Sequence, residues 1–110
     1  MRPETPISRP AFAEPEQGEM IVRVKFRISF GELFDAREKD VRLPRGSSMG
    51  YLLDCLCDTP ERRSAVMEGT EISSHVVVLK NGVPVRGREG LAEGLSHNDV
   101  VAIFPLLAGG

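Results

Sequence analysis

The sequence predicts an α+β domain in which a mixed β-sheet packs on one main helix. Three observations lead to this fold class: apolar and polar residues alternate in IVRVKFRISF, a helical period appears in SSMGYLLDCLCD, and β-branched runs flank Asn81-Gly82. Alternation is typical of a half-buried strand, and apolar residues at i, i+3, i+4 and i+7 are typical of a helix that buries one face. A strand pair, a helix and returning strands together form a sheet with the helix across one side.

The chain divides into a leader, residues 1–18, and a domain, residues 19–110. The leader carries four of the eight prolines, and we expect it to be flexible because proline removes backbone donors and favours extended conformers. The domain begins with a strand predicted over residues 21–30, in which the alternating apolar residues are Val22, Val24, Phe26, Ile28 and Phe30. Glycine and charged residues in GELFDAREKD then connect this strand to a second, short one, DVRLP.

The main helix is predicted in the segment that follows. Its buried face carries Met49, Leu52, Leu53 and Leu56, and either Ser47 or Ser48 can serve as the N-cap. Thr59-Pro60 either ends this helix or starts another turn, because proline suits a first helical position. The segment PERRSAVMEG is then expected to continue as irregular helix to about Met67.

Two further strands and a final one complete the predicted sheet. HVVVLKNGVPV is expected to be a hairpin with a type I′ turn at Asn81-Gly82, and REGLAEGLSHND a loop with one helical turn around Leu91–Glu93. The last strand, DVVAIFPLL, is apolar on both faces, so we expect it in the middle of the sheet, parallel to the first strand. Nine residues are expected in the core: Val24, Phe26, Leu52, Leu53, Leu56, Val77, Leu79, Val101 and Ile103.

Composition excludes several classes of function. The chain has 110 residues, of which 41% are hydrophobic and 27% are charged, and both its length and its composition are ordinary for one globular domain. A net charge of −2 gives no electrostatic case for nucleic acid or for an anionic membrane, and no apolar run approaches the roughly 20 residues that span a bilayer. Two cysteines make no disulfide framework and no signal peptide is visible, so the expected location is the cytoplasm.

The order of the elements is the layout of the β-grasp, or ubiquitin-like, fold, and particular segments make the likeness more specific. MIVRVKF, VRLPRGSSMGYLLDCL, VVLKNGVPV and GLSHNDVVAIFPLLAGG, with the final Gly109-Gly110, resemble the MoaD/ThiS family of sulfur carriers. The resemblance implies a carrier protein, which is not itself an enzyme. It further implies that a ubiquitin-activating-type adenylyltransferase (MoeB/ThiF-like) activates the terminal carboxylate with ATP, and that a sulfur donor converts the product into a thiocarboxylate.

The resemblance assigns roles to residues at the end of the chain. Gly110 would carry the adenylate and then the thiocarboxylate, and Gly109 would let the flexible tail enter a narrow channel because it has no side chain. The residues expected to bind partners are Phe104, Pro105, Leu106, Leu107 and Ala108. No cofactor is expected on the chain itself, since the partner enzyme would use the ATP.

A basic stripe on the first strand is a second candidate contact. Arg23, Lys25 and Arg27 alternate with the apolar residues and therefore lie on the face opposite the core. They either form a plain solvated strand face or dock on acidic groups of a partner.

The cysteines and histidines are expected to be structural. Cys55 and Cys57 point about 200° apart on a helix, no third cysteine completes a metal site, and both are expected to be small buried or half-buried residues. The alternative is a thiol that meets the sulfur donor or the thiocarboxylate. His75 and His97 have no ligand-like neighbours in the sequence, and no metal site is expected.

The recipient of the sulfur stays open at this stage. The AIFPLLAGG ending and the length favour the large subunit of molybdopterin synthase as the protein that receives the sulfur. This chain would then be the small subunit of that enzyme. Thiamine, tungsten cofactor, cysteine and tRNA thiolation are alternatives within sulfur carriage. The same activated carboxylate could instead be joined to a lysine, as in a ubiquitin-like modifier, and the glycine pair could also be incidental in an interaction module.

Overall fold

The computed structural model describes residues 18–106, so that most of the predicted leader and the tail residues 107–110 lie outside the described part of the chain. The elements follow in the order β1 (Glu19–Phe26), α1 (Phe30–Leu33), β2 (Glu38–Pro44), α2 (Met49–Leu56), α3 (Pro60–Val66), β3 (Met67–Glu68), β4 (Glu71–Ile72), β5 (Val76–Lys80), β6 (Val83–Pro84), α4 (Gly87–Ala92) and β7 (Val100–Pro105).

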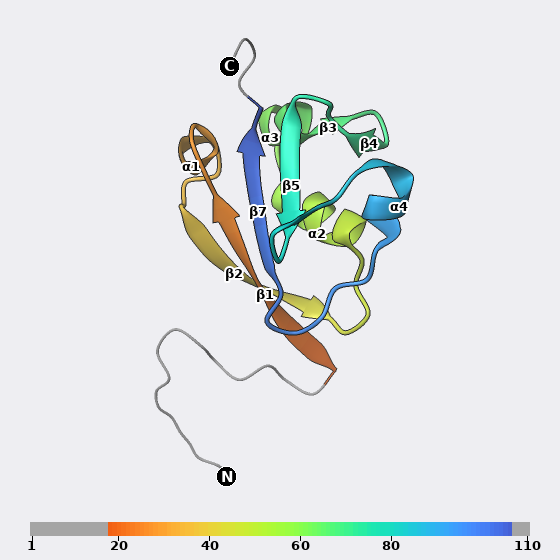
Figure 1. Cartoon of the computed structure of the whole chain (residues 1–110). Coiled ribbons are helices and arrows are strands. Elements are labelled where there is room, and N and C mark those ends of the chain that lie inside the picture. The colour runs from red at the N-terminus through yellow and green to blue at the C-terminus, as the bar shows by residue number, and fades with distance from the viewer. Residues whose placement is uncertain (1–17, 107–110) are drawn as a thin grey trace.

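The main sheet has five strands in the order β2-β1-β7-β5-β6. β7 lies at the centre, parallel to β1 and antiparallel to β5 (Figure 1). This arrangement confirms the prediction that the strand with two apolar faces is central and that the first strand is its parallel neighbour. With α2 packed on one face, the domain is the mixed-sheet α+β fold that the sequence predicts.

The core lies between α2 and the sheet. Alternate residues of β1 and the apolar face of α2 are buried, together with two residues of β7. The fully buried side chains are Met20, Leu43, Met49, Leu52, Leu53, Ile103, Val22, Val24, Val66, Val78 and Val101. Ser48 is the N-cap of α2, because its Oγ accepts a hydrogen bond from the Tyr51 backbone N–H at 3.1 Å.

The predicted core is wrong at two positions of β5. Val77 and Leu79 are half-buried on the opposite face of the sheet, and Val78 is the buried residue, with 1% of its surface exposed. The register with β7 explains this placement, since Val78 lies opposite the buried Ile103. Neighbouring residues of a strand point to opposite faces, so Val78 on the core side places Val77 and Leu79 on the other side.

The predicted first strand is too long. β1 ends at Phe26, and Ile28 has a φ of 59°, which breaks the extended backbone before the short helix α1. Phe30 is nevertheless buried, because it reaches the core from α1. There it contacts Phe34 edge to face at 5.9 Å between ring centroids, and Phe34 stacks on Phe26 at 4.4 Å.

The remaining connections follow local sequence signals. The β5–β6 turn is the predicted type I′ turn, with φ of 52° at Asn81 and 86° at Gly82. α3 is a separate helix, as one of the two alternatives had it, because Thr59 Oγ1 accepts the Arg62 backbone N–H and Pro60 occupies the first turn. α4 is longer than the single predicted turn, and the two-residue pair β3–β4 was not predicted.

Candidate functional site: the end of the central strand

The chain leaves the sheet at a fixed point. β7 ends at Pro105, which lies opposite Val76 of β5, and the Leu106 backbone N–H then donates to the His75 carbonyl at 2.7 Å. Leu106 itself is 56% exposed. The central strand therefore carries the tail to one end of the sheet and releases it beside an exposed apolar side chain.

The sheet face opposite α2 presents apolar side chains next to this exit. Phe104 of β7 lies opposite Val77 of β5, and Ala102 lies opposite Leu79, two residues away on each strand. All four are half-buried, as expected for side chains on an uncovered sheet face that cover part of one another's surface. Phe104 is thus outside the core, on the uncovered face of the sheet.

The three residues of the predicted basic stripe differ in the ion pairs that they form within residues 18–106. Arg23 is held within the sheet, because its Nε lies 3.0 Å from Oδ1 of Asp40 and 3.9 Å from Oε1 of Glu38 on β2. The hydrogen bond to Asp40 raises the pKa of the Arg23 guanidinium above its ordinary value. Within residues 18–106, by contrast, Lys25 and Arg27 form no ion pair. Lys25 lies opposite Ala102, at the margin of the apolar face.

Four of the predicted site residues fall outside the described part of the chain. These residues are Leu107, Ala108, Gly109 and Gly110. The described part of the chain ends just before them, with Phe104 and Pro105 at the end of β7 and with Leu106.

The cysteines differ in environment. Cys57 is buried at the end of α2, and burial raises the pKa of its thiol to about 11. The expectation of a buried or half-buried residue is wrong for Cys55, which is exposed because it lies on the outer face of α2. In the described range, no group of three or more His, Cys, Asp or Glu residues could hold a metal ion.

His97 has a structural role. Its Nδ1 accepts the Ile21 backbone N–H at 3.1 Å, which ties the loop before β7 to β1. The His75 carbonyl accepts the Leu106 backbone N–H after the end of β7, and the His75 backbone N–H donates to Ser73 Oγ at 3.1 Å.

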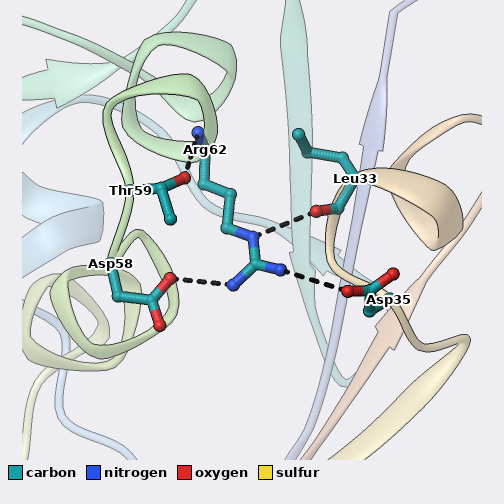
Figure 2. Close-up of polar contacts among 5 residues, drawn as sticks. All are labelled: Leu33, Asp35, Asp58, Thr59 and Arg62. Atoms are coloured by element: carbon teal, nitrogen blue, oxygen red, sulfur yellow. Dashed lines mark hydrogen bonds and ion pairs between the residues drawn. The ribbon is translucent and has the colours of Figure 1, made fainter.

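Sequence reasoning missed an arginine that braces the exit end of the sheet. Arg62 of α3 donates from Nε to the Leu33 carbonyl at 3.0 Å and from Nη1 to Asp58 at 2.8 Å, and its Nη2 lies 3.9 Å from Asp35 (Figure 2). Its guanidinium also lies 5.3 Å from the centroid of the Phe34 ring. The hydrogen bond to Asp58 lowers the pKa of that carboxyl. Arg62 therefore fixes the β1–β2 connection, residues 27–37, against α3.

The fold and the exit of the tail define a small ubiquitin-like domain of the β-grasp class. Over residues 18–106, none of the helices has the length and apolar character that a bilayer crossing requires. Comparison with known proteins then identifies the family. The model of the ThiS family matches residues 29–110, and the chain belongs to this family, whose members are small carrier proteins and not catalytic enzymes.

Individual relatives agree with this assignment. The chain is 30% identical over 92 residues to Small archaeal modifier protein 3 of Haloferax volcanii, a match that covers 83% of this chain and all of the relative. The solution structure of the Haloferax volcanii HVO 2177 protein is similar with a TM-score of 0.75 and 28% identity, over 96% of this chain and 100% of that one. A putative molybdopterin converting factor, subunit 1, from Pyrococcus furiosus has a TM-score of 0.65 and 26% identity, over 80% and 99% of the two chains.

Proposed function

We propose that this chain is a cytoplasmic sulfur carrier whose Gly110 carboxylate is adenylated and then converted into a thiocarboxylate. The acceptor that we favour is a molybdopterin precursor on the large subunit of a molybdopterin synthase. The observation that carries the proposal is the exit of the tail: a central strand, fixed by the Leu106–His75 hydrogen bond, leads into Gly109-Gly110. The likeness to the Pyrococcus furiosus protein supports this choice of acceptor.

The chemistry requires an enzyme other than this chain. A carboxylate is a poor acyl electrophile, so one of its oxygens must first attack the α-phosphorus of ATP, which releases pyrophosphate and leaves an acyl adenylate. A sulfur nucleophile at the oxidation level of sulfide then attacks the acyl carbon, and the bond to AMP breaks. ATP would be bound by the adenylyltransferase, and the carrier contributes only its terminal carboxylate and a surface for recognition.

The face around Phe104 suits recognition by such partners. We define the docking surface as Val77, Leu79, Ala102, Phe104 and Leu106 with Lys25. It combines four half-buried apolar side chains and the exposed Leu106 with Lys25, which forms no ion pair within residues 18–106. An aromatic anchor surrounded by smaller apolar groups, with charge at the rim, is the usual composition of a protein interface.

Protein conjugation is the second candidate function. The 30% identity to Small archaeal modifier protein 3, over the whole of that relative, favours it. Its activation step would be the same, but a lysine ε-amine would then attack the acyl carbon, the bond to AMP would break, and an isopeptide bond would form in place of the thiocarboxylate.

Mass spectrometry of the protein isolated from its own cells separates the two functions. Sulfur carriage predicts an intact mass that is raised by the replacement of one oxygen by sulfur, and a mature chain that ends at Gly110. Conjugation predicts other proteins that carry this chain on a lysine. A mature protein extended beyond Gly110, with neither product, would contradict both.

A further inference from the structure

Ile28 occupies a turn position that does not suit it. The Phe30 backbone N–H donates to the Arg27 carbonyl at 3.2 Å, which closes a four-residue turn with Ile28 and Ser29 at its centre. Ile28 has a φ of 59°, and Ser29 has φ −67° and ψ −13°. A positive φ at the first central residue, followed by a negative one, corresponds to a type II′ turn, in which glycine, asparagine and aspartate dominate the first position.

Isoleucine is the exception among the residues with positive φ. Apart from glycines, the others within residues 18–106 are Asp35, Asn81 and Asn98, whose short polar side chains tolerate this region. A β-branched residue there is strained. Burial of the side chain does not offset this strain, since Ile28 is 57% exposed. Strained residues of this kind often mark functional positions, which points to a role for Ile28 outside the fold.

The turn lies at the end of the sheet from which the tail leaves. The Arg27 backbone N–H donates to the Ile103 carbonyl at 3.1 Å, two residues before Pro105, and α1 and the end of β7 lie at the same end of the sheet in Figure 1. An enzyme that holds the Gly110 carboxylate must come within about 13–14 Å of Leu106, the reach of four extended residues. Such an enzyme would therefore cover this end.

The segment that carries Ile28 is held rigidly. Arg62 binds the Leu33 carbonyl and lies near Asp35 (Figure 2), and Phe34 stacks on Phe26. A braced segment loses little conformational entropy when a partner binds it. The exposed side chain is thus already in place for a contact.

The charges around Ile28 indicate the chemistry of the partner. The turn borders an open cleft of about 1020 Å³, and three cations along it, Lys25, Arg27 and Arg37, form no ion pair within residues 18–106. Of the cleft's carboxylates, Asp35 lies near Arg62, Glu38 lies near Arg23, and Glu32 has no cation partner in that range. The balance of unpaired charge is positive.

We propose that Ile28 is an anchor for the adenylyltransferase that activates the tail: its side chain enters an apolar pocket of that enzyme, and carboxylates at the rim of the pocket pair with Arg27 and Arg37. This inference rests on the proposed function, because it takes the adenylyltransferase as the occupant. It adds a contact beside the docking surface, on the β1 side of β7, so the enzyme would hold the carrier on both sides of the end of β7.

The test uses a substitution that relieves the strain while it removes the apolar side chain. Ile28→Asn should leave the urea midpoint of unfolding unchanged or raise it, because asparagine tolerates a positive φ. It should raise KM for the carrier in ATP-dependent pyrophosphate release by the cognate adenylyltransferase, and lower kcat/KM on the order of tenfold, a typical loss for a truncated interface anchor. Ile28→Val, which keeps an apolar β-branched side chain, should retain most of the activity.

Val83→Asn is the matched control. Val83 is also an exposed β-branched residue, at 61%, but it follows the β5–β6 turn. This turn lies at the opposite end of the sheet, because Lys80 at the end of β5 pairs with Val101 near the start of β7. Its kcat/KM should equal that of the wild type. Equal kinetics for Ile28→Asn and the wild type, or a lowered urea midpoint for Ile28→Asn, would overturn the anchor while leaving the carrier function standing. No pyrophosphate release with the wild type would instead contradict the proposed function, and the anchor with it.

Discussion

Phe104 of β7 lies directly opposite Val77 of β5, on the sheet face that α2 leaves uncovered. Both side chains are half-buried, so the pair belongs neither to the core nor to plain solvated surface. Two residues further along the chain, Leu106 is exposed where the tail departs. This relationship places Phe104 on the strand that leads to the tail, so under the proposed function a partner that binds Phe104 is positioned to receive Gly110.

Phe104→Ala should separate binding from stability. Since the ring is only half-buried, its loss should cost less than the roughly 3–5 kcal/mol typical of a core phenylalanine. We expect the affinity for the adenylyltransferase to fall on the order of tenfold, measured by titration calorimetry, with urea unfolding measured in parallel. A stability loss in the core range with unchanged affinity would assign Phe104 to the fold alone.

Leu53→Ala tests the packing of α2 on the sheet. Leu53 is 1% exposed, so the substitution should lower the free energy of unfolding by about 2–5 kcal/mol. Tyr51→Ala on the same helix is the control, because Tyr51 is 47% exposed and its replacement should cost about 0.5 kcal/mol or less. If Leu53→Ala also cost less than that, the buried face of α2 would be misassigned.

The buried thiol of Cys57 should make the free energy of unfolding fall as the pH rises into the alkaline range. Its pKa is raised from 9.0 to about 11 in the folded chain, mainly by burial. The folded state therefore keeps a proton that the unfolded state releases above its own pKa. The resulting stabilisation is fully present below pH 9 and is lost as the pH rises toward 11. Urea midpoints across this range should fall more steeply for the wild type than for Cys57→Ala, and parallel curves would contradict this reading.

The sequence predicts the fold well where a pattern depends on one element. Two apolar faces placed β7 at the centre, and Asn81-Gly82 identified the hairpin turn. The prediction failed at Val77 and Leu79 because the run VVVL has no alternation, so only the register with β7 decides which face is buried. It failed at the end of β1 because Ile28 and Phe30 continue the apolar period although the chain has already turned.

The candidate site was predictable only in part. The order of the elements and the final glycines indicated the exit of a tail from the central strand. The pairing of Arg23 with Asp40 depends on the β1–β2 register, and the brace at Arg62 joins residues 29 positions apart in the chain, Leu33 and Arg62. No local pattern encodes such contacts, because they arise from packing between elements.

The central claim is that the free carboxylate of Gly110 is the reacting group, and its most direct test compares three chains: the wild type, a chain lacking Gly110, and a chain with one alanine added after it. Each is incubated with the cognate adenylyltransferase and ATP, and pyrophosphate release is followed, with unfolding midpoints as the control for folding. The account predicts release with the wild type alone and equal midpoints for all three. Undiminished release from the extended chain would contradict it, because the carboxylate of Gly110 is then tied up in an amide bond.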